Sequence, residues 1–193
     1  MPFLLLKKIP RNECLIEAAA QFSDLDPSAC EAFLHLMQTA DEAFRVTDSN
    51  LARHSISQGR FMVLMLLLDK TCNCPKPRTP AELAELANVT RATMTGLVDT
   101  LERDGLVKRE PDLVDRRMMS VHLTPKGRAL LDTILPTHFQ RMAALMQTLD
   151  EAERRTLIQL LGKVREQAAK LFPAEQGSGS DKPSSASPLP SCS

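Results

Sequence analysis

The stretch between residues 79 and 123 constrains the fold most, because the spacing of its apolar residues changes there from a helical to a strand-like period. Thr79-Pro80-Ala81-Glu82 has an N-cap threonine, a proline at the first helical position and a glutamate that completes a capping box. We expect a short helix to about Ala87, a tight connection, and a second helix from the cap Thr90 to Asp104-Gly105. Two short helices joined by a tight turn predict a helix-turn-helix.

The residues after Gly105 predict a β-hairpin. Leu106 to Glu110 is typical of one strand, and Met118 to Leu123 predicts the other, with Met119, Val121 and Leu123 on one face. The tip between them is basic. Seven basic residues stand against four acidic ones between positions 103 and 128, so this region carries a positive charge that the whole chain lacks.

Long helices are expected on both sides of this region. Asp26-Pro27 opens a helix that runs to near Asn50, and Ser57 caps another, whose stretch from Phe61 to Leu68 is apolar on every side and indicates a central helix. Thr124-Pro125 opens a third, which we expect to bend at Pro136, and a last helix starts near residue 150. Only 4% of the 193 residues are aromatic, which favours a mainly α fold with aliphatic packing over a β-barrel or sandwich.

The amino-acid composition limits the kinds of function that the chain can have. The 24 Lys and Arg balance the 24 Asp and Glu, so total charge gives no argument for nucleic-acid binding. The longest apolar run, Phe61 to Leu68, is too short to cross a membrane, and the N-terminus does not resemble a signal peptide. Five cysteines without a framework spacing favour reduced thiols, so we expect a cytoplasmic protein with no membrane association.

We find no arrangement of residues typical of catalysis, no zinc spacing and no phosphate-binding glycine loop, so we expect neither an enzyme nor a cofactor or metal. Cys72 and Cys74 form an isolated Cys-x-Cys pair that would suit a redox or soft-metal role, although ordinary loop thiols are the simpler interpretation.

The second short helix has an outward face suited to DNA. Small and hydroxylated residues lie opposite the apolar stripe, so the helix can enter the major groove, where threonines contact base edges and Arg91 reaches guanine or phosphate. An ordinary amphipathic surface helix is the alternative. The residues that we expect to contact DNA from this helix are Thr90, Arg91, Thr93 and Thr95.

The hairpin tip carries Arg116 and Arg117 beside Asp115, whose carboxylate can orient one guanidinium. An arginine at this place can enter a narrow minor groove, where the negative potential is enhanced. A solvated hairpin remains the alternative for the charges alone.

Taken together, these segments resemble the MarR/SlyA family of winged helix-turn-helix transcription regulators, over about Leu51 to Val164. The likeness is most specific in Thr90-Arg91-Ala92-Thr93-Met94-Thr95-Gly96-Leu97-Val98-Asp99, in Leu101-Glu102-Arg103-Asp104-Gly105-Leu106-Val107, and in Asp115-Arg116-Arg117 followed by Val121-His122-Leu123-Thr124-Pro125-Lys126-Gly127. Many members carry Arg where this chain has Gly96.

The resemblance implies a homodimer, a palindromic double-stranded DNA operator and a ligand-responsive repressor, with Arg117 as the minor-groove arginine and Asp115 as its orienting partner. It also implies a small aromatic or acidic effector, in a cleft that His35, Arg60, Met62 and Met65 would line; core methionines and surface polar groups are the plainer interpretation of each. The implied organisation is a partly helical N-terminal extension (1–25), dimerisation helices (26–56 and 124–172), a winged helix-turn-helix (57–123) and a disordered tail (173–193).

One rival function remains open at this point. Winged helices also serve as protein–protein interaction modules without specific DNA binding, and the zero net charge together with Asp99 and Glu102 on the recognition helix suits that interpretation. Steep salt dependence of binding would favour DNA.

Overall fold

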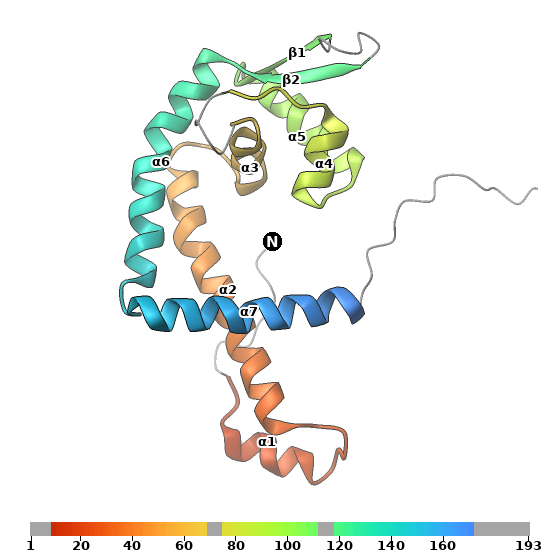
Figure 1. The fold of residues 1–193 in the computed structure, drawn as a ribbon, viewed down its shortest axis with the longest axis vertical. Coiled ribbons are helices and arrows are strands. Elements are labelled where there is room, and N and C mark those ends of the chain that lie inside the picture. The colour runs from red at the N-terminus through yellow and green to blue at the C-terminus, as the bar shows by residue number, and fades with distance from the viewer. Residues whose placement is uncertain (1–8, 69–74, 112–117, 172–193) are drawn as a thin grey trace, which may run out of the picture. The chain divides into compact units, whose positions relative to one another are not determined.

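The computed structural model describes residues 9–68, 75–111 and 118–171, which form seven helices and a two-stranded sheet (Figure 1). The chain divides into two compact units, Met1–Gln147 and Thr148–Ser193, each described by itself below. The fold is mainly α with a small hairpin, as the sequence predicts. None of the helices in the described ranges is long and apolar enough to cross a membrane.

A long helix, α2 (Pro27–Ala52), begins at the expected cap. The carboxylate of Asp26 accepts hydrogen bonds from the backbone N–H groups of Ser28 (2.9 Å) and Ala29 (3.1 Å). These bonds and that from the Ser28 hydroxyl hold the pKa of Asp26 below its usual value. The shorter helix α1 (Asn12–Ala19) packs on α2 and buries Leu15.

The core lies where α3 (Gln58–Leu66), α4 (Pro80–Ala87) and α5 (Arg91–Arg103) meet the hairpin. Ser57 caps α3 as expected, but α3 is not buried on every side, because Met62 is 43% exposed. The core is aliphatic, and its fully buried side chains include Leu51, Val63, Leu64, Leu67, Leu83, Met94, Val98, Leu101, Val107, Val121, Leu131 and Ile134.

The hairpin pairs β1 (Val107–Pro111) with β2 (Met119–Leu123) in antiparallel register, Val107 opposite Leu123. A single bridge from Arg78 to Val121 extends the sheet, which the sequence did not indicate. The expected alternation along β2 is wrong at one end: Met119 is exposed and its neighbour Ser120 is buried. Met119 pairs with Pro111 at one end of the ladder. Val107, which is buried in the core, lies at the other end.

Helix α6 (Pro125–Met146) starts at the cap Thr124 and continues through Pro136. Its first half packs into the core, and its second half lies along α2 and leaves large apolar side chains exposed. Gly127 is in close contact with the residue that precedes β1: a Cβ atom there would lie 2.1 Å from the Leu106 carbonyl oxygen. The exposed apolar residues of the second half are Phe139, Met142, Leu145 and Met146.

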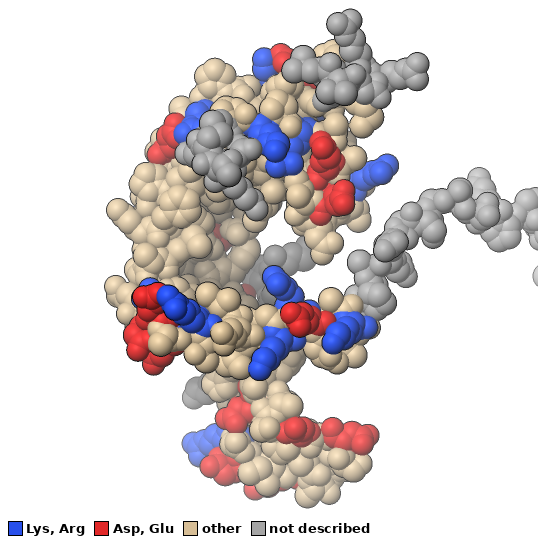
Figure 2. Space-filling view, viewed as in Figure 1, with Lys and Arg blue, Asp and Glu red and all other residues tan. Residues whose placement is uncertain are grey.

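The second unit contains α7 (Glu151–Leu171). It starts with a capping box: Glu153 accepts the backbone N–H of Asp150 at 2.8 Å, and Asp150 accepts that of Glu153 at 2.9 Å. Its acidic and basic groups lie in its first turns and again in its C-terminal half, with uncharged residues between them (Figure 2). No residue of α7 is buried within the chain, and its apolar residues Ile158, Leu160, Leu161, Val164 and Leu171 are exposed.

Candidate nucleic-acid interface

Helices α4 and α5 are joined by a tight turn that the local sequence dictates. Thr79 and Glu82 form the predicted capping box at the start of α4, and Asn88 ends it in the left-handed region with φ 51°. Asparagine tolerates this conformation better than other non-glycine residues. Thr90 then caps α5: its Oγ1 accepts the N–H of Thr93 at 3.1 Å and lies 2.9 Å from the Thr93 hydroxyl.

The outward face of α5 is open and polar. Met94, Val98 and Leu101 are buried beneath it, which fixes the rotation of the helix on the core. The hydroxyl of Thr95 donates to the Arg91 carbonyl oxygen at 2.9 Å. The four positions predicted to contact DNA from α5 are each exposed near its N-terminal end: Thr90, Arg91, Thr93 and Thr95.

Arg91 has no ion-pair partner among the residues that the structure describes. Gly96 lies on the same exposed face, and a Cβ atom added there would meet no other atom within 4 Å. Within the described part of the chain, this end of α5 thus offers a guanidinium without an ion-pair partner, hydroxyl groups and an uncrowded backbone, which together suit close approach to a polyanion.

A second cation, Arg109 on β1, is fully engaged within the protein. Its guanidinium binds Asp99 and Glu102 of α5, at 2.6 Å in both cases. Burial opposes the charge of Arg109, but the hydrogen bonds that it donates to Asp99 and Glu102, together with their negative charges, outweigh burial and raise the pKa of Arg109 above its usual value. The two carboxylates that suited a protein-binding role therefore already have an intramolecular partner.

The predicted wing-tip residues Asp115, Arg116 and Arg117 fall between β1 and β2, outside the described residues. Cys72, Cys74 and the tail from 173 to 193 also lie outside them. In the described ranges, no group of three or more metal-binding side chains comes together.

A cavity of about 530 Å³ lies beside the C-terminal end of α5. Arg60, whose side chain is 15% exposed, forms an ion pair there with Asp104, and the Lys126 Nζ donates to the Asp104 carbonyl oxygen at 2.8 Å. Arg60 Nε is buried without a hydrogen-bond partner in the described part of the chain. Ile56 and Leu130 contribute apolar lining, so the cavity combines cationic donors with an apolar wall.

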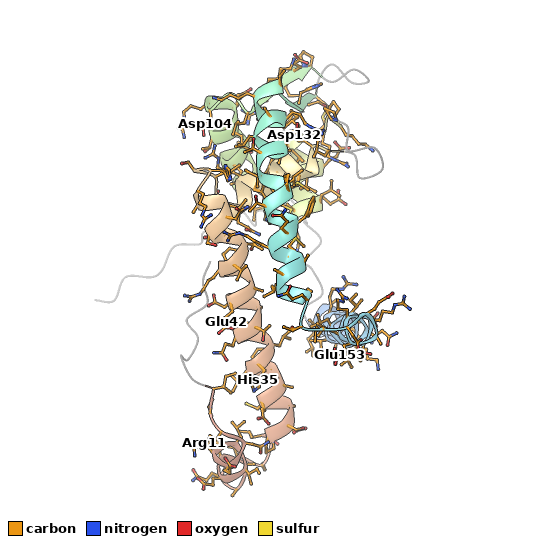
Figure 3. All side chains as sticks on the ribbon, turned by 90° about the vertical axis from the view of Figure 1, so that its left-hand side faces the viewer. Arg11, His35, Glu42, Asp104, Asp132 and Glu153 are labelled. Carbon is orange, nitrogen blue, oxygen red and sulfur yellow. The ribbon has the colours of Figure 1, made fainter. Side chains whose placement is uncertain are left out.

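The four residues predicted to line an effector cleft come from two helices, His35 from α2 and Arg60, Met62 and Met65 from α3. Only Arg60 lines the cavity just described; Met62 is exposed, Met65 is half-buried, and His35 is exposed on α2. Figure 3 shows His35 well down α2, far from Asp104. A second, apolar cavity of about 360 Å³ between α2 and α6 is lined by Phe44, Thr47, Gln58, Met142 and others, and includes none of the four.

Comparisons with known proteins agree with this geometry. The MarR family model matches residues 56–119. The HTH-type transcriptional repressor YetL of Bacillus subtilis is 35% identical over 161 residues, which is 83% of this chain and 95% of that protein. The HTH-type transcriptional repressor NicR of Pseudomonas putida is 39% identical over 88 residues, which is 46% of this chain and 56% of that protein.

Solved structures show the same arrangement. A mutant of E. coli MarR complexed with operator DNA matches with a TM-score of 0.58 and 27% identity, covering 67% of this chain and 89% of that one. Bordetella bronchiseptica BpsR, whose DNA binding is regulated by 6-hydroxynicotinic acid, matches with a TM-score of 0.58 and 25% identity, over the same shares of both chains.

Proposed function

Because this chain belongs to the MarR family of DNA-binding transcription regulators, we propose that two copies bind a palindromic operator, with α5 of each in a major groove and each wing in a flanking minor groove. Half-sites would then lie about 10 base pairs apart, one turn of the duplex. In this proposal Thr90, Arg91, Thr93 and Thr95 contact the major groove, and Arg117, oriented by Asp115 and next to Arg116, enters the minor groove. We also propose that the protein represses transcription and that it acts in the cytoplasm.

The exposed face of α5 is the observation that carries this proposal. The helix is fixed by three buried side chains, while its opposite face presents hydroxyls and a guanidinium without an ion-pair partner in the described ranges. A rigid helix with a small polar face is what the major groove admits. No catalytic role is assigned to the chain.

Exposed apolar side chains support the homodimer. In the first unit they include Phe33 of α2 and the second half of α6, and in the second unit they lie along α7. Exposed apolar surface on this scale is typical of protein interfaces, because water would otherwise remain in contact with it. We assign residues 26–56 and 124–172 to dimerisation and 57–123 to DNA binding.

The proposal is tested by Arg117→Ala. We assign Arg117 to DNA contact and give it no part in folding, so we expect a folded dimer whose operator affinity falls about tenfold. Arg155→Ala is the matched control: it removes the same charge from an exposed α7 ion pair with Glu151 and should leave affinity unchanged. Operator affinity by fluorescence anisotropy, with sedimentation to verify the dimer, gives both results. Unchanged affinity of a folded Arg117→Ala dimer would remove the wing from the mechanism.

The cavity at Arg60 is our candidate effector site. Its cationic donors and apolar wall suit a small aromatic carboxylate, and such an anion would compete with Asp104 for Arg60 at the C-terminal end of α5. The first probe is 6-hydroxynicotinic acid, because this acid regulates DNA binding by BpsR. Operator release by the acid should require Arg60 and be lost in Arg60→Gln. Equal release from both proteins would place the effector elsewhere.

A further inference from the structure

We propose that Arg109 is a positioning residue for DNA binding: it neutralises the two carboxylates of α5 and fixes the wing strand against that helix, without itself contacting DNA. The inference rests on the proposed use of α5 as the recognition helix. It concerns a cation of the wing that charge counting alone would assign to a phosphate contact.

Both terminal nitrogens of the Arg109 guanidinium and its backbone N–H point towards α5. Its Nη2 donates to Asp99 Oδ1 and its Nη1 to Glu102 Oε2, both at 2.6 Å, and its backbone N–H donates to Glu102 Oε1 at 2.9 Å. The Arg109 side chain is 24% exposed, whereas that of Lys108, the neighbour on β1, is 53% exposed. Successive strand residues point to opposite faces, so Arg109 faces α5 and Lys108 faces away.

The charge of α5 explains why such a partner matters. The helix itself carries Arg91 and Arg103 against Asp99 and Glu102, so its own charges balance. Unpaired carboxylates on a recognition helix would repel the phosphates of DNA. With Arg109 bound to both acids, the helix and its partner carry a net positive charge, and Arg91 and Arg103 stay available to DNA.

The same contacts set the place of the wing. Arg109 pairs with Val121 in the hairpin, and its N–H donates to Glu102 of α5 instead of to solvent. One carboxylate thereby binds both the backbone and the side chain of the strand. The direction in which β1 leaves the core is thus fixed relative to α5 before DNA binds, which lowers the ordering cost of binding.

A mutant cycle tests this role. Arg109→Ala should weaken operator binding about tenfold, because two carboxylates lose their partner beside the DNA surface. Asp99→Asn with Glu102→Gln should recover part of that loss in the Arg109→Ala background, namely the part due to unpaired charge, and should raise affinity less in the otherwise unaltered protein, where Arg109 already neutralises both acids. Lys108→Ala, which removes the same charge from the exposed face of β1, is the matched control and should change affinity little.

Unfolding of each variant separates positioning from plain stability. The triple variant also lacks the Arg109 contacts that fix the wing strand, so it should be no more stable than Arg109→Ala while its operator affinity recovers in part. Arg109→Lys should lose part of the affinity, since one ammonium cannot bridge both carboxylates as a planar guanidinium does. A direct phosphate contact would instead survive in the lysine variant.

Equal gains from removing the acids in both backgrounds, or full affinity of Arg109→Ala, would overturn the proposal. The unaltered protein is measured in the same series, so the inference and the proposed function fail separately. If the unaltered protein binds operator DNA, the proposed function stands whatever the mutant cycle shows.

Discussion

Gly127→Ala tests whether the helix that leaves the wing is held against the core as closely as the structure shows. The new Cβ atom would lie 2.1 Å from the Leu106 carbonyl oxygen and 2.8 Å from a methyl of Leu123, whereas real Cβ atoms essentially never come within 3.0 Å of another heavy atom. The start of α6 must therefore move by at least the 0.9 Å between 2.1 and 3.0 Å. The oxygen involved also accepts from the backbone N–H (3.1 Å) and the hydroxyl (3.0 Å) of Thr124, the α6 cap.

The free energy of unfolding should fall accordingly. Overpacking of this kind costs about 1–3 kcal/mol, while alanine in place of glycine returns at most about 1 kcal/mol of helix propensity. Gly96→Ala is the control, because its Cβ meets nothing within 4 Å and the same propensity gain should stabilise the protein by about 0.5–1 kcal/mol. The two identical substitutions are thus predicted to have opposite signs.

The assay is urea unfolding at one fixed protein concentration, since the stability of a dimer depends on concentration. Far-ultraviolet circular dichroism is the readout, because the chain has neither Trp nor Tyr for fluorescence. A Gly127→Ala protein as stable as the unaltered one would refute the close contact between α6 and Leu106.

Three further predictions follow from individual residues. Thr79→Ala removes the α4 capping box, in which Glu82 accepts the backbone N–H of Thr79 at 2.7 Å and Thr79 accepts that of Glu82 at 3.2 Å. The substitution should lower the free energy of unfolding by about 1 kcal/mol in the same denaturation assay. Gly96→Ala, although stabilising in free protein, should weaken operator binding in an anisotropy titration, because the methyl group lies on the face proposed to meet DNA; undiminished affinity would contradict that placement. Burial lowers the pKa of His138, which packs against Phe61 with ring centroids 4.9 Å apart. As the pH falls below 6.5, the imidazole is protonated in the unfolded chain before it is protonated in the folded one, so the free energy of unfolding decreases. His138→Gln should flatten this part of the curve of stability against pH.

Local signals made the helix starts predictable. Asp26, Ser57, Thr79, Thr90 and Thr124 all cap helices where the sequence indicated, because an N-cap and its partner lie within three residues of each other. The outward face of α5 was equally predictable, since it follows from the helical period of Met94, Val98 and Leu101.

Contacts between distant segments gave no such signal. The ion pair of Arg60 with Asp104 had no signal in the sequence, and Arg109 stood out only as part of a basic stretch although it binds Asp99 and Glu102. Which carboxylate a long cationic side chain meets depends on how the helices cross the hairpin, and no spacing in the sequence encodes that. The Arg78–Val121 bridge was missed for the same reason.

Selection of preferred sequences from a random duplex DNA pool, followed by titration of the selected duplex at several salt concentrations, tests the central claim most directly. Our account predicts a palindrome with half-sites about 10 base pairs apart, bound by a dimer with an affinity that falls steeply as salt rises. Failure of a well-folded dimer to enrich any sequence, or binding indifferent to salt, would contradict the proposed operator recognition.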